Sequence, residues 1–190
     1  MASGITDTKV GTNSNTHNLT FMTTRNDLGK FFQEHFLTGI GAEIGCLRGE
    51  FSKRLARDYK GKILSIDYFD PSDLEYDPKT EEICRFNLKG TNCQVIKGTS
   101  VEVAKTITDN SLDWIYLDAD HRYPGIKADL NAWFPKVRPG GVVSGHDYIH
   151  HNVGDYVFGV TKAVNEFCLL YGYQIKLLDA KKFASWYFIK

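Results

Sequence analysis

The sequence predicts a doubly wound α/β fold, in which a seven-stranded, mostly parallel sheet carries helices on both faces and ends in an antiparallel hairpin. From residue 40 onward, short apolar segments of strand length alternate with amphipathic segments of helix length. Glycine, proline and polar residues separate these segments, as in repeated β–α units. The last two apolar segments follow each other without a helix between them, which indicates the closing hairpin.

The first helix is expected at residues 25–36, where the apolar residues between Leu28 and Phe36 recur at helical spacing. The further helices are expected at residues 50–59, 80–88, 101–107, 126–137 and within 155–171. The strands are expected at residues 40–44, 62–66, 93–96, 112–117, 142–144, 173–178 and 185–189. Residues 112–117 are continuously apolar, which is typical of a strand buried on both faces. Residues 70–78 are polar and contain two prolines, and therefore predict a loop.

The length of 190 residues predicts one domain over residues 21–190, preceded by a disordered tail over residues 1–20. Serine, threonine, asparagine and glycine dominate this tail, which offers too little apolar surface to offset the entropy of ordering. The chain carries 23 basic and 23 acidic side chains, so its net charge is zero. This balance disfavours binding to nucleic acid or to a membrane surface through bulk charge.

The chain is expected to be a cytoplasmic protein with reduced cysteines. No apolar run approaches the ~18 residues of a membrane span, and the N-terminus lacks the apolar region of a signal peptide. The four cysteines are spaced by 38, 9 and 75 residues, a pattern that fits neither a zinc site nor a disulfide framework.

A glycine-containing loop is expected where the first strand meets its helix. Its spacing is E-x-G-x-x-x-G, from Glu43 through Gly45 to Gly49. This differs from the G-x-G-x-x-G pattern of dinucleotide sites, and Glu43 would repel a pyrophosphate but suits an ammonium group. Asp67 ends the second strand, where a carboxylate can accept hydrogen bonds from both hydroxyls of a ribose. These residues predict an adenosine-type ligand without a diphosphate.

The sequence resembles the class I S-adenosylmethionine-dependent methyltransferases, which have a Rossmann-like fold. The loop from Glu43 to Gly49 resembles the first motif of that family, Asp67 its ribose-binding acid and Asp118 its acid after the fourth strand. Residues 138–141 (RPGG) resemble the turn before its fifth strand. The resemblance implies S-adenosylmethionine as cofactor. It also implies contacts to the cofactor from several residues, namely Glu43, Gly45, Cys46, Gly49, Asp67, Tyr68, Ser100 and Asp118. Within this set, Tyr68 would pack on the ribose or adenine, and Ser100 would lie near the adenine edge.

A second group of polar residues follows the fourth and fifth strands. Asp118 and Asp147 are 29 residues apart, and on neighbouring parallel strands they would meet at one edge of the sheet. Two carboxylates this close repel each other unless a proton or cation lies between them, which favours Mg2+ or Mn2+. The pattern is similar to that of metal-dependent macrolide-sugar and catechol-type O-methyltransferases. This resemblance implies that Asp118 and Asp147 are metal ligands and that His121 is the base.

Tyr148 stands where catechol-type enzymes usually have asparagine, so the third ligand is open between His146, Asp120 and water. Structural alternatives also remain. Asp118 would then cap a helix, His121 would hydrogen-bond within a loop and Asp147 would form a turn.

The predicted activity is transfer of a methyl group from S-adenosylmethionine to an oxygen of a small molecule, assisted by a divalent metal. The alternatives are a metal-free enzyme acting on a nitrogen or a macromolecule, and a non-catalytic cofactor-binding module that needs a partner. A homodimer is expected to complete substrate capture, and no nucleic-acid or membrane partner is expected. A nicotinamide oxidoreductase is disfavoured because the dinucleotide glycine pattern is missing.

Overall fold

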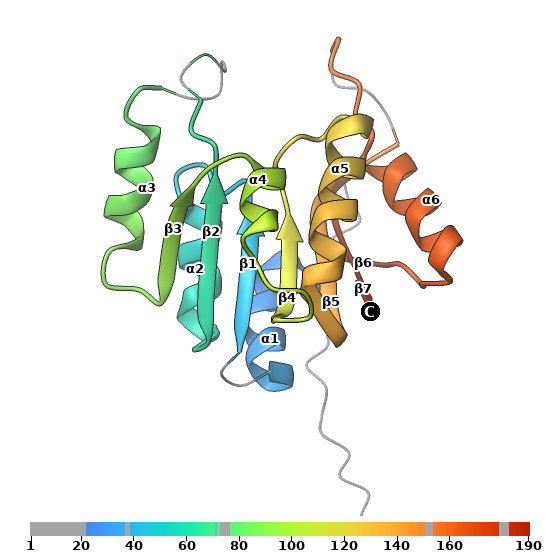
Figure 1. Ribbon diagram of the computed structural model, residues 1–190, viewed down its shortest axis with the longest axis horizontal. Helices are drawn as coiled ribbons and strands as arrows, with labels where there is room; N and C mark the ends of the chain where they lie inside the picture. Colours follow the sequence, from blue (N-terminus) through green and yellow to red (C-terminus); the bar gives the residue numbers. More distant parts are fainter. Residues whose placement is uncertain (1–21, 37–38, 71, 73–76, 151–153, 179–182) are drawn as a thin grey trace, which may run out of the picture.

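The computed structural model describes residues 22–36, 39–70, 72, 77–150, 154–178 and 183–190. They form a seven-stranded sheet with the strand order β3-β2-β1-β4-β5-β7-β6, which confirms the predicted fold class (Figure 1). The strands are β1 (Ile40–Ile44), β2 (Lys62–Asp67), β3 (Cys93–Lys97), β4 (Leu112–Leu117), β5 (Val137–Tyr148), β6 (Lys176–Leu178) and β7 (Ala184–Ile189). The helices are α1 (Leu28–Phe36), α2 (Glu50–Asp58), α3 (Thr80–Leu88), α4 (Ser100–Lys105), α5 (Tyr123–Trp133) and α6 (Val160–Tyr171). Two short 3₁₀ helices, Arg25–Asp27 and Phe134–Lys136, precede α1 and β5.

The pairing of the strands places their carboxyl ends along one edge of the sheet. The strands β1, β2, β3, β4 and β5 run parallel, whereas β7 pairs antiparallel with both β5 and β6. Ile44 at the end of β1 lies opposite Ile66 in β2 and Leu117 in β4. The chain order reverses between β1 and β4, and ligands of open α/β sheets bind at such a reversal.

Apolar layers cover both faces of the sheet. The layer against α4, α5 and α6 contains Ile44 and Leu117, whereas Trp114 and Tyr116 of the same strand β4 face α1 and α2. This alternation is the period of two that a strand imposes on its side chains. Trp114 is fully buried and stacks on Phe32 of α1 with ring centroids 4.3 Å apart. The parallel core is therefore fixed on both faces.

Most predicted elements are confirmed within a few residues, but the bounds of three elements were wrong. The helix expected at 126–137 begins at Tyr123, because Pro124 favours the first turn, and α5 ends at Trp133 before a 3₁₀ turn. The strand expected at 142–144 extends from Val137 to Tyr148, since residues 138–141 interrupt its pairing with β4 but do not end it. The strand expected at 173–178 is only Lys176–Leu178.

No helix in the part of the chain that the structure describes is long and apolar enough to cross a membrane. The expected tail over residues 1–20 lies outside the described residues.

Candidate active site

A cavity of about 520 Å3 opens at the carboxyl edge of the sheet, at the reversal of strand order. Its walls come from the loops that follow β1, β2, β3 and β4. Five residues predicted to bind the cofactor line it, namely Gly45, Asp67, Tyr68, Ser100 and Asp118. The structure therefore brings together residues that are up to 73 positions apart in the sequence.

The loop after β1 is held close to the neighbouring strands. Gly45 has φ +91°, and a Cβ atom there would lie 2.2 Å from the carbonyl oxygen of Asp118, so only glycine fits. The Gly45 amide donates to the Ile66 carbonyl at 2.8 Å. Leu47 also has a positive φ, of 47°, and its amide donates to Asp67 Oδ2 at 2.7 Å. The loop thus keeps its shape through backbone hydrogen bonds.

Asp67 at the end of β2 is almost fully buried yet forms part of the cavity wall. Its Oδ2 accepts the Leu47 amide, and its Oδ1 accepts the Phe69 amide at 2.9 Å. A carboxylate oxygen can accept more than one hydrogen bond. Asp67 thus lies in the cavity wall, and the contact to a ribose that the sequence predicts for it stays a prediction.

Three residues of the predicted cofactor set do not line the cavity. The side chain of Glu43 lies on the α2 side of the sheet, where its carboxylate accepts a hydrogen bond from Ser52. Burial raises the pKa of Glu43 to about 8, although the Ser52 hydrogen bond acts in the opposite direction. Cys46 packs in a small cluster with Cys84, Leu88 and Phe69.

Gly49, the third of these residues, precedes α2 with φ +74°, and a Cβ atom there would lie 2.9 Å from Leu88 Cγ. Within the motif E-x-G-x-x-x-G, residues Ile44, Gly45 and Leu47 line the cavity, whereas Glu43, Cys46 and Gly49 pack against α2 and α3. The roles of Glu43, Cys46 and Gly49 toward a cofactor stay predictions.

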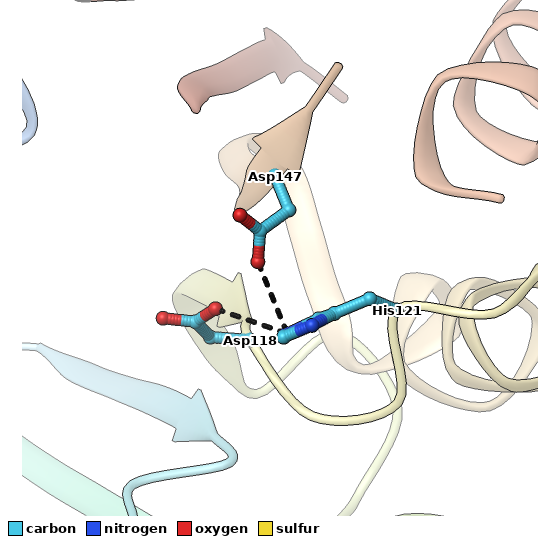
Figure 2. Close-up of side chains that lie close together, drawn as sticks. All are labelled: Asp118, His121 and Asp147. Carbon is cyan, nitrogen blue, oxygen red and sulfur yellow. Dashed lines mark ion pairs between the residues drawn. The ribbon is translucent and has the colours of Figure 1, made fainter. Parts of the chain in front are cut away.

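The predicted catalytic residues, Asp118 and His121, both line the cavity and lie close to Asp147 (Figure 2). His121 Nε2 lies 3.4 Å from Asp118 Oδ1 and 3.2 Å from Asp147 Oδ2. One potential ligand atom from each of these three residues lies within 4.8 Å of the others. Asp118 and His121 come from the loop after β4, and Asp147 comes from the end of β5. The imidazole stacks on Phe158, with ring centroids 5.8 Å apart and the planes 8° from parallel.

Asp147 lies at an irregular point of the sheet. Its φ is +55°, a rare conformation for a residue with a side chain, and the pairing of β5 with β7 shifts between Gly145 and Tyr148. Burial favours a higher pKa for Asp147, but the hydrogen bond from His146 and the nearby positive charges outweigh it and lower the pKa. The carboxylate at this irregular point is buried and faces His121, with Asp147 Oδ2 3.2 Å from His121 Nε2.

Among the residues proposed for a third ligand, only His146 lies beside the two carboxylates. His146 Nδ1 is 3.3 Å from Asp147 Oδ1 and 3.8 Å from Asp118 Oδ1. The carboxylate of Asp120 instead accepts two hydrogen bonds from the Arg122 guanidinium, both at 2.8 Å. The Tyr148 hydroxyl donates to Asn165 on α6 at 2.7 Å. Asp120 and Tyr148 are therefore directed to other partners.

Arg25 is a neighbour of this site that the sequence analysis did not identify. Its Nη1 lies 3.9 Å from Asp118 Oδ2, and its guanidinium lies over the Phe51 ring at 4.6 Å from the centroid. Arg25 belongs to the 3₁₀ turn before α1, 93 positions before Asp118, and no sequence motif links the two residues. The structure thus adds a permanent cation beside Asp118.

The comparisons with known proteins identify the family of this chain. Residues 42–148 match the family model of the methyltransferase domain. An uncharacterised protein, R132, of Acanthamoeba polyphaga mimivirus is 30% identical over 127 residues, which cover 64% of this chain and 56% of that protein. An uncharacterised protein, y4gI, of Sinorhizobium fredii is 36% identical over 67 residues, 35% of this chain and 7% of that protein. The chain thus spans little more than half of the viral relative and a small part of the bacterial one.

Solved structures of methyltransferases have the same fold. A candidate caffeoyl-CoA O-methyltransferase from Staphylococcus aureus has a TM-score of 0.67 and 17% identity, over 87% of this chain and 82% of that one. The O-methyltransferase from Bacillus cereus, solved with SAH, has a TM-score of 0.63 and 19% identity, over 91% and 85%. TomG from Streptomyces achromogenes, solved with SAM, has a TM-score of 0.63 and 16% identity, over 87% and 79%. Because the family model covers 107 of the 190 residues (42–148), this chain belongs to the methyltransferase domain family.

Proposed function

We propose that this protein transfers a methyl group from S-adenosylmethionine to a hydroxyl oxygen of a small molecule, with a divalent cation at Asp118 and Asp147. One observation carries the proposal. The cavity that has a ribose-type carboxylate, Asp67, in its wall is also lined by Asp118 and His121, and these two residues form one group with Asp147. Cofactor and acceptor can therefore meet within it.

The cofactor half of the proposal rests on the loop after β1 and on Asp67. Gly45 gives the close approach that a bulky ligand needs, and the fixed carboxylate of Asp67 offers acceptors for two ribose hydroxyls. The solved relatives from B. cereus and S. achromogenes bind SAH and SAM, which supports the same cofactor here. The methionyl part would then extend along Gly45 toward Asp118.

The acceptor half rests on His121. Methyl transfer from a sulfonium is an in-line displacement, so the protein must align the hydroxyl and remove its proton. His121 Nε2 faces the two carboxylates at 3.4 and 3.2 Å, and their negative charges stabilise the imidazolium that forms when it takes a proton. Phe158 keeps the ring plane fixed by stacking.

The residues fit a divalent cation. One oxygen of Asp118 and one of Asp147 lie within 3.4 Å of His121 Nε2, so the three side chains converge on one small region. His146 Nδ1 lies 3.3 Å from the other oxygen of Asp147, Oδ1. Carboxylate oxygens are ligands that Mg2+ and Mn2+ prefer. When bound, such an ion would lower the pKa of an acceptor hydroxyl and hold it in place. Asp118, Asp147 and His146 would hold the ion, and His121 would remain the base.

The proposal is tested by incubating the protein with methyl-labelled S-adenosylmethionine and a panel of phenols, catechols and hydroxylated sugars. We expect label transfer to at least one acceptor in the presence of Mg2+ or Mn2+, and its loss when a chelator is added. The Asp147→Asn variant should lose this transfer, whereas Asp155→Asn, an exposed carboxylate, should keep it. Transfer that resists the chelator would overturn the metal part, and cofactor binding without any transfer would favour the non-catalytic alternative.

The remaining expectations from the sequence stay proposals. We take residues 21–190 as the catalytic domain, a small molecule rather than nucleic acid as the acceptor, and a homodimer as the assembly. Size measurement in solution and mobility shifts with RNA and DNA would test the last two.

A further inference from the structure

A buried carboxyl group lies behind the part of the cavity wall that Ser100 forms. Asp129 of α5 is only 4% exposed. Its Oδ1 accepts a hydrogen bond from the hydroxyl of Ser100, the first residue of α4. Ser100 lines the cavity, whereas Asp129 does not. Asp129 can therefore affect a ligand only through Ser100.

The neighbours of Ser100 decide what its hydroxyl offers to the cavity. The Trp133 ring nitrogen donates to Ser100 Oγ at 2.8 Å, and an indole N–H can only donate. A hydroxyl has one hydrogen and two lone pairs. Trp133 occupies one lone pair and Asp129 takes the hydrogen, so the remaining lone pair is left for the cavity. Ser100 is thereby held as a hydrogen-bond acceptor.

The position of Ser100 identifies the part of the ligand that it meets. The inference rests on the proposed function, in which Asp67 binds the ribose and the methyl group points toward Asp118. The base must then lie against the wall formed by Gly98 and Ser100 after β3. Adenine carries an amino group, a donor, on carbon 6, whereas hypoxanthine carries a carbonyl, an acceptor, at that position.

We propose that Asp129 is a positioning residue that fixes Ser100 as an acceptor and thereby makes the cavity select adenine over hypoxanthine. A free serine hydroxyl would serve both bases equally, because it can turn its hydrogen toward a carbonyl. The hydrogen bond to Asp129 prevents the Ser100 hydroxyl from turning its hydrogen toward the ligand. The selectivity comes from an unfavourable contact, since hypoxanthine would place its carbonyl oxygen against a lone pair of Ser100.

The ionisation of Asp129 gives this arrangement a pH dependence. Burial raises the pKa of Asp129 to about 6, while the Ser100 hydrogen bond opposes the shift and the charge of Asp120 adds to it. Asp120 is itself paired with Arg122. Above pH 6 the ionised carboxylate must accept from Ser100. Below it, protonated Asp129 can donate to Ser100 and release the serine hydrogen toward the ligand.

The test compares the affinities for S-adenosylhomocysteine and for S-inosylhomocysteine, its analogue with a carbonyl in place of the amino group and a hydrogen on the neighbouring nitrogen 1. Calorimetry is done at about pH 8 and about pH 5 on the wild type, Asp129→Leu, Ser100→Ala and the double variant. At the higher pH we expect the wild type to prefer the adenine form at least tenfold. Asp129→Leu should reduce this ratio of affinities to below about threefold. The ratio for the wild type should also be smaller at about pH 5 than at about pH 8.

The double variant separates positioning from a merely structural role. If Asp129 acts through Ser100, adding Asp129→Leu to Ser100→Ala leaves the ratio of the two affinities unchanged. Thermal unfolding checks that each variant is folded. Should Asp129→Leu fail to fold, the change of ratio between the two pH values in the wild type carries the test.

Several results would overturn the inference. They are equal affinities of the wild type for both ligands, a ratio that Asp129→Leu leaves intact, and a ratio independent of pH. If neither ligand binds the wild type, the cofactor assignment itself fails and the inference falls with it. Binding of the adenine form without selectivity would overturn the inference alone.

Discussion

The two halves of the carboxyl edge of the sheet differ in how their charged groups are surrounded. In the half formed by β1, β2 and β3, the polar groups satisfy each other, since Asp67 accepts the amides of Leu47 and Phe69. In the half formed by β4 and β5, groups of like charge are brought together, because Asp118 and Asp147 both approach the same nitrogen of His121, Nε2 (Figure 2). The first half is fixed by hydrogen bonds from backbone amides, and the second concentrates charge.

This difference shows where binding and chemistry are expected to separate. A carboxylate held by two backbone amides stays in place without a ligand, so its loss should weaken the affinity for the cofactor. The carboxylates beside His121 and the proposed cation influence the protonation of each other and of the histidine. Changes there should therefore alter proton transfer and metal affinity. Four substitutions examine this division, from the largest expected effect to the smallest.

The strongest test of the charged half is His121→Ala. We expect the rate of methyl transfer to fall by about 10²–10⁴, the usual contribution of a general base. The dissociation constant for S-adenosylhomocysteine should stay within about twofold, because the base acts on the acceptor. His150→Ala, at an exposed histidine after β5, is the matched control and should retain the wild-type rate. A His121→Ala variant with the wild-type rate would contradict the assignment of proton transfer to the half formed by β4 and β5.

The corresponding test of the binding half is Asp67→Asn. We expect the affinity for S-adenosylhomocysteine to fall about 100-fold, because each hydrogen bond to a charged group contributes about 1.5–3 kcal/mol. Isothermal calorimetry measures the change, with Asp58→Asn at the exposed end of α2 as control. An unchanged affinity would remove Asp67 from the cofactor site.

Much of the first half could be predicted from the sequence. The apolar strands and the spacing from Glu43 to Asp67 are local signals, and parallel strands bring their ends to one edge whatever their side chains. The burial of Glu43 could not be predicted. Which face of β1 its side chain occupies depends on the pairing with β2 and β4, where residues alternate between two apolar layers.

The second half was predictable only in part. The pattern of Asp118, His121 and Asp147 indicated that these residues meet, and the structure places them together. The sequence did not reveal the left-handed backbone at Asp147 or the engagement of Asp120 by Arg122. Arg25 could not be identified because its distance to Asp118 depends on how α1 packs against the sheet face that it shares with α2.

Glu43→Gln tests whether the Glu43 carboxyl is a protonated group of the core or an ionised ligand of the cofactor. Burial raises the pKa of Glu43 to about 8 from 4.5, so the folded protein holds a proton that the unfolded chain releases. The stabilisation from this proton is complete below about pH 4.5 and is lost as the pH rises through about 8. The neutral glutamine avoids that loss.

We therefore expect Glu43→Gln to match the wild type at about pH 5 and to exceed its free energy of unfolding by more than about 1 kcal/mol near pH 8. Denaturant unfolding at both pH values measures the difference. Equal stabilities near pH 8 would mean that Glu43 is ionised in the folded protein.

The smallest expected effect is that of Arg25→Gln. Removing a cation 3.9 Å from Asp118 should tighten the binding of Mn2+ by about two- to fivefold, since an exposed ion pair contributes at most about 1 kcal/mol. Electron paramagnetic resonance of free Mn2+ measures the affinity. Arg54→Gln is the matched control, because Arg54 donates to Asn26 in the same turn. Weaker binding of Mn2+ by Arg25→Gln would contradict the assigned role of Arg25.

The most direct test of the central claim is a calorimetric titration with S-adenosylhomocysteine, with and without Mg2+, on the wild type and on Asp118→Ala/Asp147→Ala. Binding of the cofactor product in the micromolar range, with a magnesium heat that the double variant loses, is the result that we predict. Cofactor binding without any magnesium heat would contradict the metal assignment and direct the search to metal-free acceptors. The absence of S-adenosylhomocysteine binding would contradict the assignment of this protein as an S-adenosylmethionine-dependent methyltransferase.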